Sequence, residues 1–362
     1  MATTLSLQTT NDAPLGTLDV TAYQRDGFVI ARGLLGAAEV SEIADEASRL
    51  HRDHMDLPGC FRRTAISDGA DPLAAWPRMM HPHRQTPVLM HYLLHPRIGA
   101  ALEALLREAP IAAQSMFYWK PPGARGQALH QDNFYLKVHP GTCIAAWVAI
   151  DSANRENGGL NVVPGSHAMD LFCPEEADAG VSFTRELVPV PRGLRAVPTD
   201  LNAGDVLFFG GNLIHGSDPN RTADRFRRSF ICHYVGESAR ELSRWYRPIF
   251  RFDGTEVEIG DATGGGPCGD VVVGGVAWAQ ERGGIAGVQV RVDGGPWIDA
   301  QLGPDGGDDY WRQWFHRWSA APGAHRIAVR AVAGNGEPQT AARAEPFPDG
   351  ASGLHELLVR VS

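Results

Sequence analysis

Lysine is almost absent from this chain of 362 residues. Only two of its 33 basic residues are lysines, Lys120 and Lys137, and the rest are arginines. The 42 acidic residues outnumber the basic ones, which leaves a net charge of −9. A protein whose main partner is a nucleic acid or an anionic membrane needs a basic face, so this composition argues against both partners.

Cysteine is also scarce, and its spacing matches no motif. The five cysteines are far apart, odd in number and form no Cys-x-x-Cys pair: Cys60, Cys143, Cys173, Cys232 and Cys268. This pattern argues against a disulfide framework and against a structural zinc site. We therefore expect most of these thiols to be reduced, buried and chemically inert.

Long apolar segments are missing as well. No run of 18 or more apolar residues occurs, so the sequence predicts no membrane-spanning helix. Residues 1–18 lack the basic and apolar regions of a signal peptide, and we expect them to form a flexible tail on a cytoplasmic protein. The length exceeds that of one ordinary domain and predicts two.

Periodicity along residues 19–255 predicts a first domain with a mainly β fold. A short strand at 27–32 is followed by an amphipathic helix at 37–51, and helical or loop character continues to about residue 108. Short apolar segments then alternate with turn residues, which is typical of a barrel or a two-sheet jelly roll. The segment "TCIAAWVAID" at 142–151 is apolar on both faces and predicts a strand that is buried on both sides.

A glycine-rich break between about 250 and 270 precedes a second domain at 265–362. Val288, Val290 and Val292 alternate there with polar residues and lead into an Asp-Gly-Gly turn, which is the pattern of a half-buried strand and hairpin. Later segments repeat this style. The sequence therefore predicts a jelly roll with flanking helices, followed by an immunoglobulin-like β-sandwich of about a hundred residues.

Metal-binding chemistry is indicated by one of three His-x-Asp triplets, although chance alone gives about one in a chain of this composition. The triplets at 51–53 and 54–56 lie on or just beyond the predicted helix, where positions i and i+2 diverge. The third, His130-Gln131-Asp132, lies in an extended segment. Positions i and i+2 share one face of a strand, so His130 and Asp132 can bind one ion together.

A third ligand should come from a separate strand of the same barrel. Two histidines and a carboxylate on one side of Fe(II) leave positions open for a cosubstrate and O2. His215 is the best candidate because it follows the apolar strand "GDVLFFGG". Among its competitors, His167 in a Pro-Gly-Ser-His turn suits a structural hydrogen bond, and His139 and His233 suit core positions or positions beside a metal ligand.

Several motifs together resemble the phytanoyl-CoA dioxygenase family of Fe(II)/2-oxoglutarate-dependent oxygenases, across about residues 20–250. They are "YQRDGFVIARGLL", "KPPG" before "LHQDN", "AAWVAID", "ENGGLNVVPGSH", "GDVLFFGGNLIHGS" and "FRRSFICHY". The resemblance implies a double-stranded β-helix, with His130, Asp132 and His215 as iron ligands. It also implies 2-oxoglutarate and O2 as cosubstrates.

The same resemblance implies an arginine that binds the far carboxylate of 2-oxoglutarate. We assign this role to Arg227, with Arg225 and Arg228 as alternatives because the preceding loop is one residue longer than is common. Ser217 matches a hydroxyl that assists the arginine, and Trp147 matches a tryptophan that lines the pocket, although an ordinary core position is an equal interpretation. Lys120 is a further candidate, either as an amine that the site needs or as a coincidence of arginine-rich composition.

The resemblance implies hydroxylation of a small-molecule metabolite at an unactivated C–H bond, with release of succinate and CO2. Halogenating relatives replace the aspartate with a small residue, and Asp132 is present here. Asn133 and Tyr135 are candidates for substrate contacts. One alternative is a non-catalytic jelly-roll module that binds a small acid or sugar. The other is a zinc hydrolase, but the sequence shows no obvious general base beside these ligands.

Residues 265–362 resemble the C-terminal dimerisation domain of sulfite-oxidase-type enzymes, on the segments "GVAWAQERGGIAGVQVRVDGGPWIDAQL" and "WRQWFHRWSAAPGAHRIAVRAVAGNG". The cofactor-binding part of those enzymes is absent, so molybdenum chemistry is not implied. Trp311, Trp314 and Trp318 either fill a small core, which we favour, or form a contact surface. A homodimer is the expected assembly.

Overall fold

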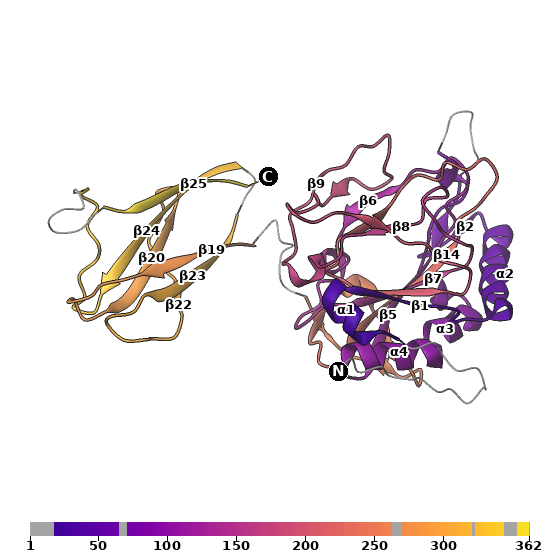
Figure 1. Cartoon of the computed structure of the whole chain (residues 1–362), viewed down its shortest axis with the longest axis horizontal. Helices are drawn as coiled ribbons and strands as arrows, with labels where there is room; N and C mark the ends of the chain where they lie inside the picture. Colours follow the sequence, from indigo (N-terminus) through magenta and orange to yellow (C-terminus); the bar gives the residue numbers. More distant parts are fainter. Residues whose placement is uncertain (1–17, 65–70, 263–269, 321–322, 344–352, 362) are drawn as a thin grey trace. The chain divides into compact units, whose positions relative to one another are not determined.

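The computed structural model describes residues 18–64, 71–262, 270–320, 323–343 and 353–361 (Figure 1). The chain divides into two compact units, residues 1–263 and 264–362. Among the described residues, no helix has the length and apolar character that a membrane span requires.

Two facing sheets form the first unit (Figure 1). The larger one has the order β1 (Phe28–Ala31), β12 (Val206–Gly210), β7 (Ile144–Ala149), β14 (Ser229–Gly236), β5 (Pro110–Tyr118), β16 (Ile249–Arg251) and β17 (Glu256–Val257), and β4 (Met79–Met80) also pairs with β5. The smaller one has the order β11 (Val197–Pro198), β8 (Leu160–Val162), β13 (His215–Ser217) and β6 (Gln127–His130). This arrangement confirms a mainly β fold.

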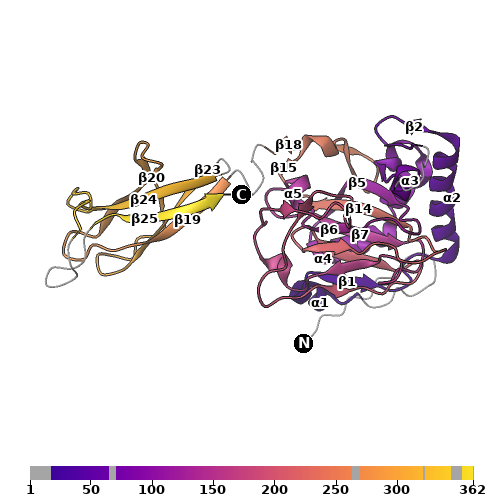
Figure 2. The same ribbon diagram turned by 90° about the horizontal axis from the view of Figure 1, so that it is seen from above.

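Helices cover the outer face of the larger sheet. They are α1 (Val20–Asp26), α2 (Ala37–Asp53), α3 (Pro87–Leu93) and α4 (Pro96–Leu106), and Figure 2 shows α2 along one flank of the unit. Apolar residues of α2 such as Ile43 and Leu50 pack with Phe117, Phe208 and Phe230 of the sheet in one buried cluster. The amphipathic face that the sequence shows at 37–51 is therefore the face that this cluster buries.

A second cluster fills the space between the two sheets. It joins Trp147, Phe209 and Ile231 of the larger sheet to Leu160 and Val162 of the smaller one. Strand β7 contributes alternate residues to both clusters, and all six of its residues are buried. This explains why its sequence is apolar on both faces.

Short elements complete the first unit. They are α5 (Asn133–Leu136), the 3-10 turns η1 (Pro72–Ala74), η2 (Pro82–Arg84), η3 (Ser166–Ala168) and η4 (Arg244–Tyr246), and the paired strands β2 (Asp56–Leu57) with β3 (Phe61–Arg62), β9 (Glu175–Glu176) with β10 (Glu186–Leu187), and β15 (Glu241–Leu242) with β18 (Gly260–Asp261). The region 54–108, predicted as helix or loop, also contains β2, β3 and β4. Cys60, Cys143 and Cys232 are buried free thiols, and Cys268 lies outside the described residues.

Strand register arranges the interior of the larger sheet in layers. His233 of β14 lies opposite Gln114 of β5 and Ala145 of β7. Two residues earlier on β14, Ile231 lies opposite Met116 and Trp147, and two residues before that, Ser229 lies opposite Tyr118 and Ala149. Because alternate residues of a strand share a face, the side chains of all three layers point between the two sheets.

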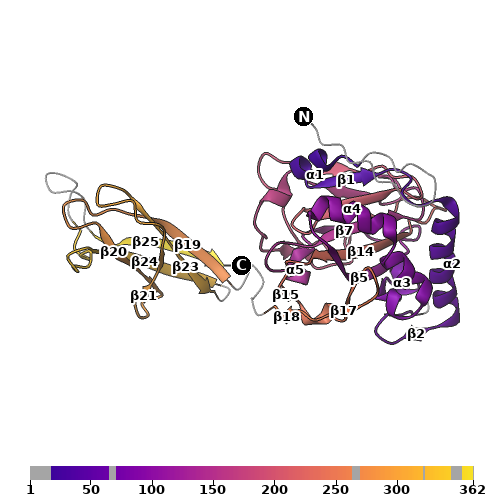
Figure 3. The same cartoon turned by 90° about the horizontal axis from the view of Figure 1, so that it is seen from below.

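The second unit consists of two antiparallel sheets around a common core (Figure 3). One sheet has the order β19 (Asp270–Ala277), β23 (Arg312–Ser319) and β22 (Gln301–Leu302), and the other β21 (Ile298–Asp299), β20 (Ile285–Val292), β24 (Gly323–Ala333) and β25 (His355–Val361). Val288 and Val290 are buried in the core, as their alternation predicts. The kinship with immunoglobulin-like sandwiches and the homodimer remain predictions.

The three tryptophans considered in the sequence, Trp311, Trp314 and Trp318, have different environments. Trp314 belongs to the buried core and Trp318 packs against it. Trp311 is 69% exposed, so the preferred core interpretation is wrong for this residue.

Candidate metal and cosubstrate site

The sequence predicts that His130 and Asp132 lie on one strand, and this prediction is wrong. Strand β6 ends at His130, and the backbone of Asp132 has the helical angles φ −63° and ψ −35° at the start of α5. The backbone carbonyl of Asp132 accepts hydrogen bonds from the N–H groups of Tyr135 and Leu136. The turn of α5 thus replaces strand alternation in bringing the carboxylate beside His130.

His215 lies in β13, directly opposite His130 of β6. The sequence had placed it at the beginning of a loop; the short strand is formed because residues 215–217 pair with β6 on one side and with β8 on the other. Gly216 makes this close pairing feasible, since a Cβ atom on it would approach the Gln127 carbonyl oxygen to 2.8 Å.

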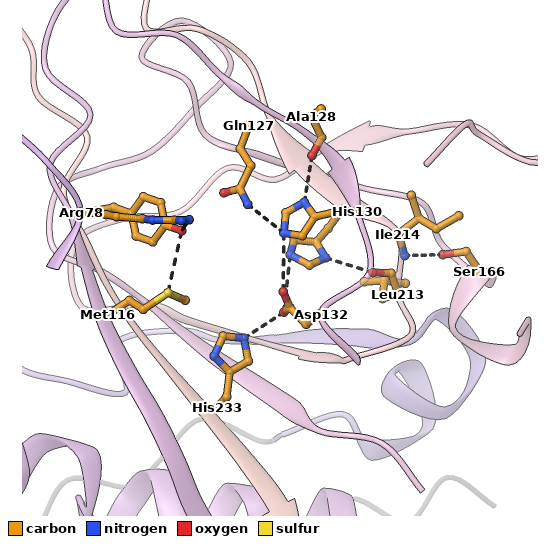
Figure 4. A network of polar contacts seen from close by, with 12 residues as sticks. Arg78, Met116, Gln127, Ala128, His130, Asp132, Ser166, Leu213, Ile214 and His233 are labelled. Carbon is orange, nitrogen blue, oxygen red and sulfur yellow. Dashed lines mark hydrogen bonds and ion pairs between the residues drawn. The ribbon is translucent and has the colours of Figure 1, made fainter. Parts of the chain in front are cut away.

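Both imidazoles are held in the form that binds a metal through Nε2. The Nδ1–H of His130 donates to the Ala128 carbonyl at 2.8 Å (Figure 4). The Nδ1–H of His215 donates to the Leu213 carbonyl at 3.0 Å. An imidazole that donates from Nδ1 keeps its lone pair on Nε2. Burial lowers the pKa of His215 to about 4, so this ring is neutral at neutral pH.

The two Nε2 atoms converge on the Asp132 carboxylate. The Nε2 of His130 lies 3.5 Å from Oδ1 of Asp132, and the Nε2 of His215 lies 3.6 Å from Oδ2. All ligand atoms of the three buried residues lie within 4.8 Å of one another. Ligands on one side of an ion with bonds of roughly 2.1 Å are separated by roughly 3 Å, so this donor set fits one metal ion.

His233 holds the carboxylate from behind. Its Nε2–H donates to Oδ2 of Asp132 at 2.9 Å, and the ring is almost fully buried (Figure 4). Burial by itself raises the pKa of the Asp132 carboxyl, but the imidazoles of His215, His233 and His130 outweigh it and hold this pKa well below its usual range. Asp132 is therefore ionised, as a metal ligand must be.

Replacing His233 with phenylalanine should lower the affinity for Fe(II) by about 10- to 100-fold, because the carboxylate loses the donor that orients it. Glutamine, which keeps a donor, should restore part of the affinity. The exposed His91→Phe is the matched control. Titration with Mn(II) followed by electron paramagnetic resonance measures the affinity, and equal values for His233→Phe and the wild type would contradict the positioning role.

Arg227 stands out among the arginines near the site because it is buried and, among the described residues, forms no ion pair with a carboxylate. Its Nε–H donates to the Gly158 carbonyl at 3.1 Å, its Nη1 donates to Ser229 Oγ at 2.8 Å, and its guanidinium lies 5.3 Å from the ring centre of Trp147. Burial lowers the pKa of Arg227 to about 10, yet the group remains a cation at neutral pH.

Lys120 adds a buried amine beside the Arg227 guanidinium. Its Nζ donates to Ser217 Oγ at 2.7 Å and to the carbonyls of Asp218 and Gly158 at 2.6 and 3.2 Å. Gly158 has φ +76°, and a Cβ atom on it would lie 2.7 Å from the Lys120 side chain, so only glycine fits there. Burial and the charge of Arg227 set the pKa of Lys120 well below its usual value.

The alternative arginines have partners elsewhere. Arg228 forms a two-pronged ion pair with Asp151, at 2.9 and 2.7 Å, and Arg225 pairs with Glu156 at 2.5 Å. Arg225 and Arg228 line a cavity of about 820 Å³, and so does His51 of α2. His130, Asp132 and His215 are not among the residues that line this cavity. Of the three arginines considered, Arg227 is thus the one that offers an uncompensated charge to an anion.

The remaining predicted residues have defined contacts. Trp147 is a core aromatic and also lies under Arg227, so both interpretations describe it. Asn133 accepts a hydrogen bond from the Val138 N–H. The Tyr135 ring lies 6.2 Å from that of His130.

His167 makes a structural bond to the Gln24 carbonyl, as expected, whereas His139 is exposed and has neither of the roles considered for it.

His233 is buried and contacts Asp132, in agreement with the positions that the sequence predicts for it. Alternation along "FRRSFICHYV" also places it on the same face as Ile231. Two other residues near the site were missed from the sequence as candidates for a role. Gln127, whose Nε2–H donates to Nε2 of His130 at 3.1 Å, is three residues from a candidate ligand. Arg78 has no comparable signal, because the sequence around it shows no periodicity.

Two histidines and an aspartate lie around one point, and a buried guanidinium and a buried amine lie at the end of the same interior. This set of groups suits a non-haem iron ion together with an anion. Residues 23–229 match the family model "Phytanoyl-CoA dioxygenase (PhyH)", more than half of the chain, and the chain belongs to this family. Its members are Fe(II)/2-oxoglutarate-dependent oxygenases. The protein is therefore an enzyme of this class, with iron, 2-oxoglutarate and O2 as its cofactor and cosubstrates.

Individual relatives support the same assignment. The rat peroxisomal phytanoyl-CoA dioxygenase is 27% identical over 236 residues, which cover 61% of this chain and 68% of the rat protein. Phytanoyl-CoA dioxygenase 1 of rice is 30% identical over 166 residues, which cover 45% of this chain and 58% of the rice protein. The crystal structure of EctD from S. alaskensis with 2-oxoglutarate and 5-hydroxyectoine is 25% identical, with a TM-score of 0.50, and covers 64% of this chain and 80% of EctD.

Proposed function

We propose that this enzyme hydroxylates a small-molecule metabolite at an unactivated C–H bond and converts 2-oxoglutarate to succinate and CO2. The observation that carries the proposal is the pairing of a complete His-Asp-His set with a buried guanidinium and a buried amine, neither of which pairs with a carboxylate in the described parts of the chain. Buried charges are costly unless they are paired, so this end of the interior is built for an anion. The distal carboxylate of 2-oxoglutarate is such an anion.

Each group then has a defined task. His130, Asp132 and His215 hold the iron, and Arg227, with Ser217 and Lys120 beside it, binds the far carboxylate. Trp147, Ile231 and Met116 form the layer between these two places and exclude water from it. When bound, iron with 2-oxoglutarate and O2 supplies the oxidising power for the C–H bond, while the protein positions the carbon to be oxidised.

Hydroxylation is preferred over halogenation because Asp132 provides a carboxylate in the donor set, where halogenating relatives have a small residue. The EctD structure contains 5-hydroxyectoine, and the rat and rice relatives are named dioxygenases. These names support the reaction type and leave the substrate of this chain open.

Anaerobic addition of Fe(II) and 2-oxoglutarate should produce a weak visible charge-transfer band, because the cosubstrate chelates the iron. Admission of O2 together with a metabolite panel should then give succinate release that one compound or class stimulates. A non-catalytic binding module would show neither signal, and a zinc hydrolase would show no requirement for 2-oxoglutarate. Absence of the band at saturating Fe(II) and 2-oxoglutarate would refute the proposal.

A further inference from the structure

Arg78 brings another positive charge to the metal site from the edge of the larger sheet. Strand β4 pairs Met79 with Phe117 and Met80 with Met116 of β5. Met79 and Phe117 are buried in the cluster outside the sheet, so alternation places the neighbouring Arg78 on the inner side, as Tyr118 is. In Figure 4 the guanidinium end of Arg78 points from this edge toward His130 and Gln127.

The contacts of Arg78 are aromatic and phenolic rather than acidic. Its Nη1 lies 3.4 Å from the Tyr118 hydroxyl, and its guanidinium lies 5.8 Å from the ring centre of Phe183. The charges of Asp132 and Arg78 act on the same two phenols: Asp132 raises the pKa of Tyr135 and of Tyr246, and Arg78 lowers it. In the part of the chain that the structure describes, no carboxylate forms an ion pair with Arg78, although arginines such as Arg62, Arg225 and Arg228 each have one.

The cosubstrate does not account for this charge. On the proposed function, one carboxylate of 2-oxoglutarate lies at the metal and the other at Arg227 and Lys120, two strands away from β4 across the larger sheet. Adjacent strands are about 4.8 Å apart, so β4 and β14 are separated by roughly 10 Å. Arg78 is exposed, so an anion that enters the site from solvent can reach its guanidinium.

We propose that Arg78 binds a carboxylate of the substrate, which is therefore an organic acid with an apolar body. The inference rests on the proposed function and names the substrate class for that site. A guanidinium offers a planar fork that matches a carboxylate. A carboxylate carries one negative charge, which matches the single positive charge of Arg78. A phosphate dianion carries more negative charge than Arg78 can neutralise. Phe183, Met116 and Tyr118 supply apolar surface for the rest of the molecule.

Paramagnetic relaxation by Mn(II) at the metal site tests the proposal without turnover. Proton relaxation is measured for octanoate and octanamide, for 4-phenylbutyrate and its amide, and for octyl phosphate, each with Mn(II), 2-oxoglutarate and the full-length protein. For at least one pair, we expect the acid to bind about tenfold more tightly than its amide, because a charge-assisted hydrogen bond replaces a neutral one. Mn(II) should increase the proton relaxation rate of this acid, as expected for a ligand bound near the metal.

Variants assign the preference to one side chain. Arg78→Gln should remove the preference for the acid, and Arg78→Lys should retain part of it. Arg62→Gln changes an exposed arginine that pairs with Asp56 and serves as the matched control with an unchanged preference. The relaxation of 2-oxoglutarate should be the same in the wild type and all three variants.

Distinct outcomes overturn distinct claims. Equal binding of acids and amides by the wild type, or a preference that survives in Arg78→Gln, refutes the role of Arg78. Tighter binding of octyl phosphate than of octanoate refutes the choice of a carboxylate, and loss of 2-oxoglutarate binding in Arg78→Gln makes Arg78 a cosubstrate ligand instead. If Mn(II) fails to relax 2-oxoglutarate in the wild type, the proposed function itself fails.

Discussion

Replacing Asp132 with alanine should abolish 2-oxoglutarate-dependent succinate formation and lower the affinity for Fe(II) by more than about 100-fold. Loss of a residue that merely supports a ligand costs up to about 100-fold in metal affinity, and Asp132 is proposed as a ligand itself. It is also the single carboxylate of the set, and its ionised form faces His130, His215 and His233 in a buried environment. Its loss removes the charge that attracts the cation as well as one of three bonds to it.

Asp132→Asn separates charge from shape, because the amide keeps the size of the side chain and loses the negative charge. We expect it to resemble Asp132→Ala in iron content and in succinate release. Asp151→Asn is the control, since this aspartate pairs with Arg228 outside the set of metal ligands. Metal analysis and succinate assays on the three purified variants measure the effect. Undiminished turnover by Asp132→Ala would exclude the assigned ligand set.

Elements with strong periodicity could be predicted from the sequence because their burial is simple. The helix expected at 37–51 is α2, Ala37–Asp53, which buries one face against the sheet. Strand β7 is apolar throughout because each of its faces meets a different core cluster. Strand β20 alternates because one face of its sheet meets a core and the other does not. In each case the pattern records how many faces the core covers.

The site was predicted less well wherever it depends on local turns. His130 and Asp132 come together because the chain enters a helical turn after β6, and strand alternation gave the correct pair for the wrong reason. Gln131 fixes this turn by donating to the carbonyls of Asp170 and Asn212 and by accepting from the Phe172 N–H. These contacts span about forty to eighty positions of sequence, and no local pattern reveals them.

Arg78 was missed for a related reason. It precedes a two-residue strand in a region without apolar periodicity, and the pairing of that strand with β5 is a contact between distant segments. The choice among Arg225, Arg227 and Arg228 depended on the family resemblance and on the strand face that Arg227 shares with Ile231, because three arginines so close together differ little in sequence. Their environments differ strongly, since Arg225 and Arg228 each pair with a carboxylate and Arg227 is buried without one.

Replacing Arg227 with methionine should raise the KM for 2-oxoglutarate by about 30-fold or more, because truncating one partner of a buried, hydrogen-bonded charge pair costs about 2–5 kcal/mol. Binding of 2-oxoglutarate stabilises the folded protein, so the variant should also lose the rise in melting temperature that the cosubstrate gives to the wild type. Steady-state assays at varied 2-oxoglutarate, and thermal unfolding with Mn(II) in its presence and absence, measure the two effects.

Arg225→Met and Arg228→Met are matched controls for this experiment. Both remove an arginine within two positions of Arg227, but their guanidinium groups already pair with Glu156 and Asp151. Arg228→Met should lower stability modestly, because a partly exposed ion pair contributes about 1 kcal/mol or less, and both controls should leave the KM for 2-oxoglutarate near its wild-type value. A purely structural role for Arg227 predicts the opposite pattern, with a lower melting temperature in the absence of 2-oxoglutarate and an unchanged KM. A large rise in KM for Arg228→Met together with a normal KM for Arg227→Met would transfer the cosubstrate role to Arg228.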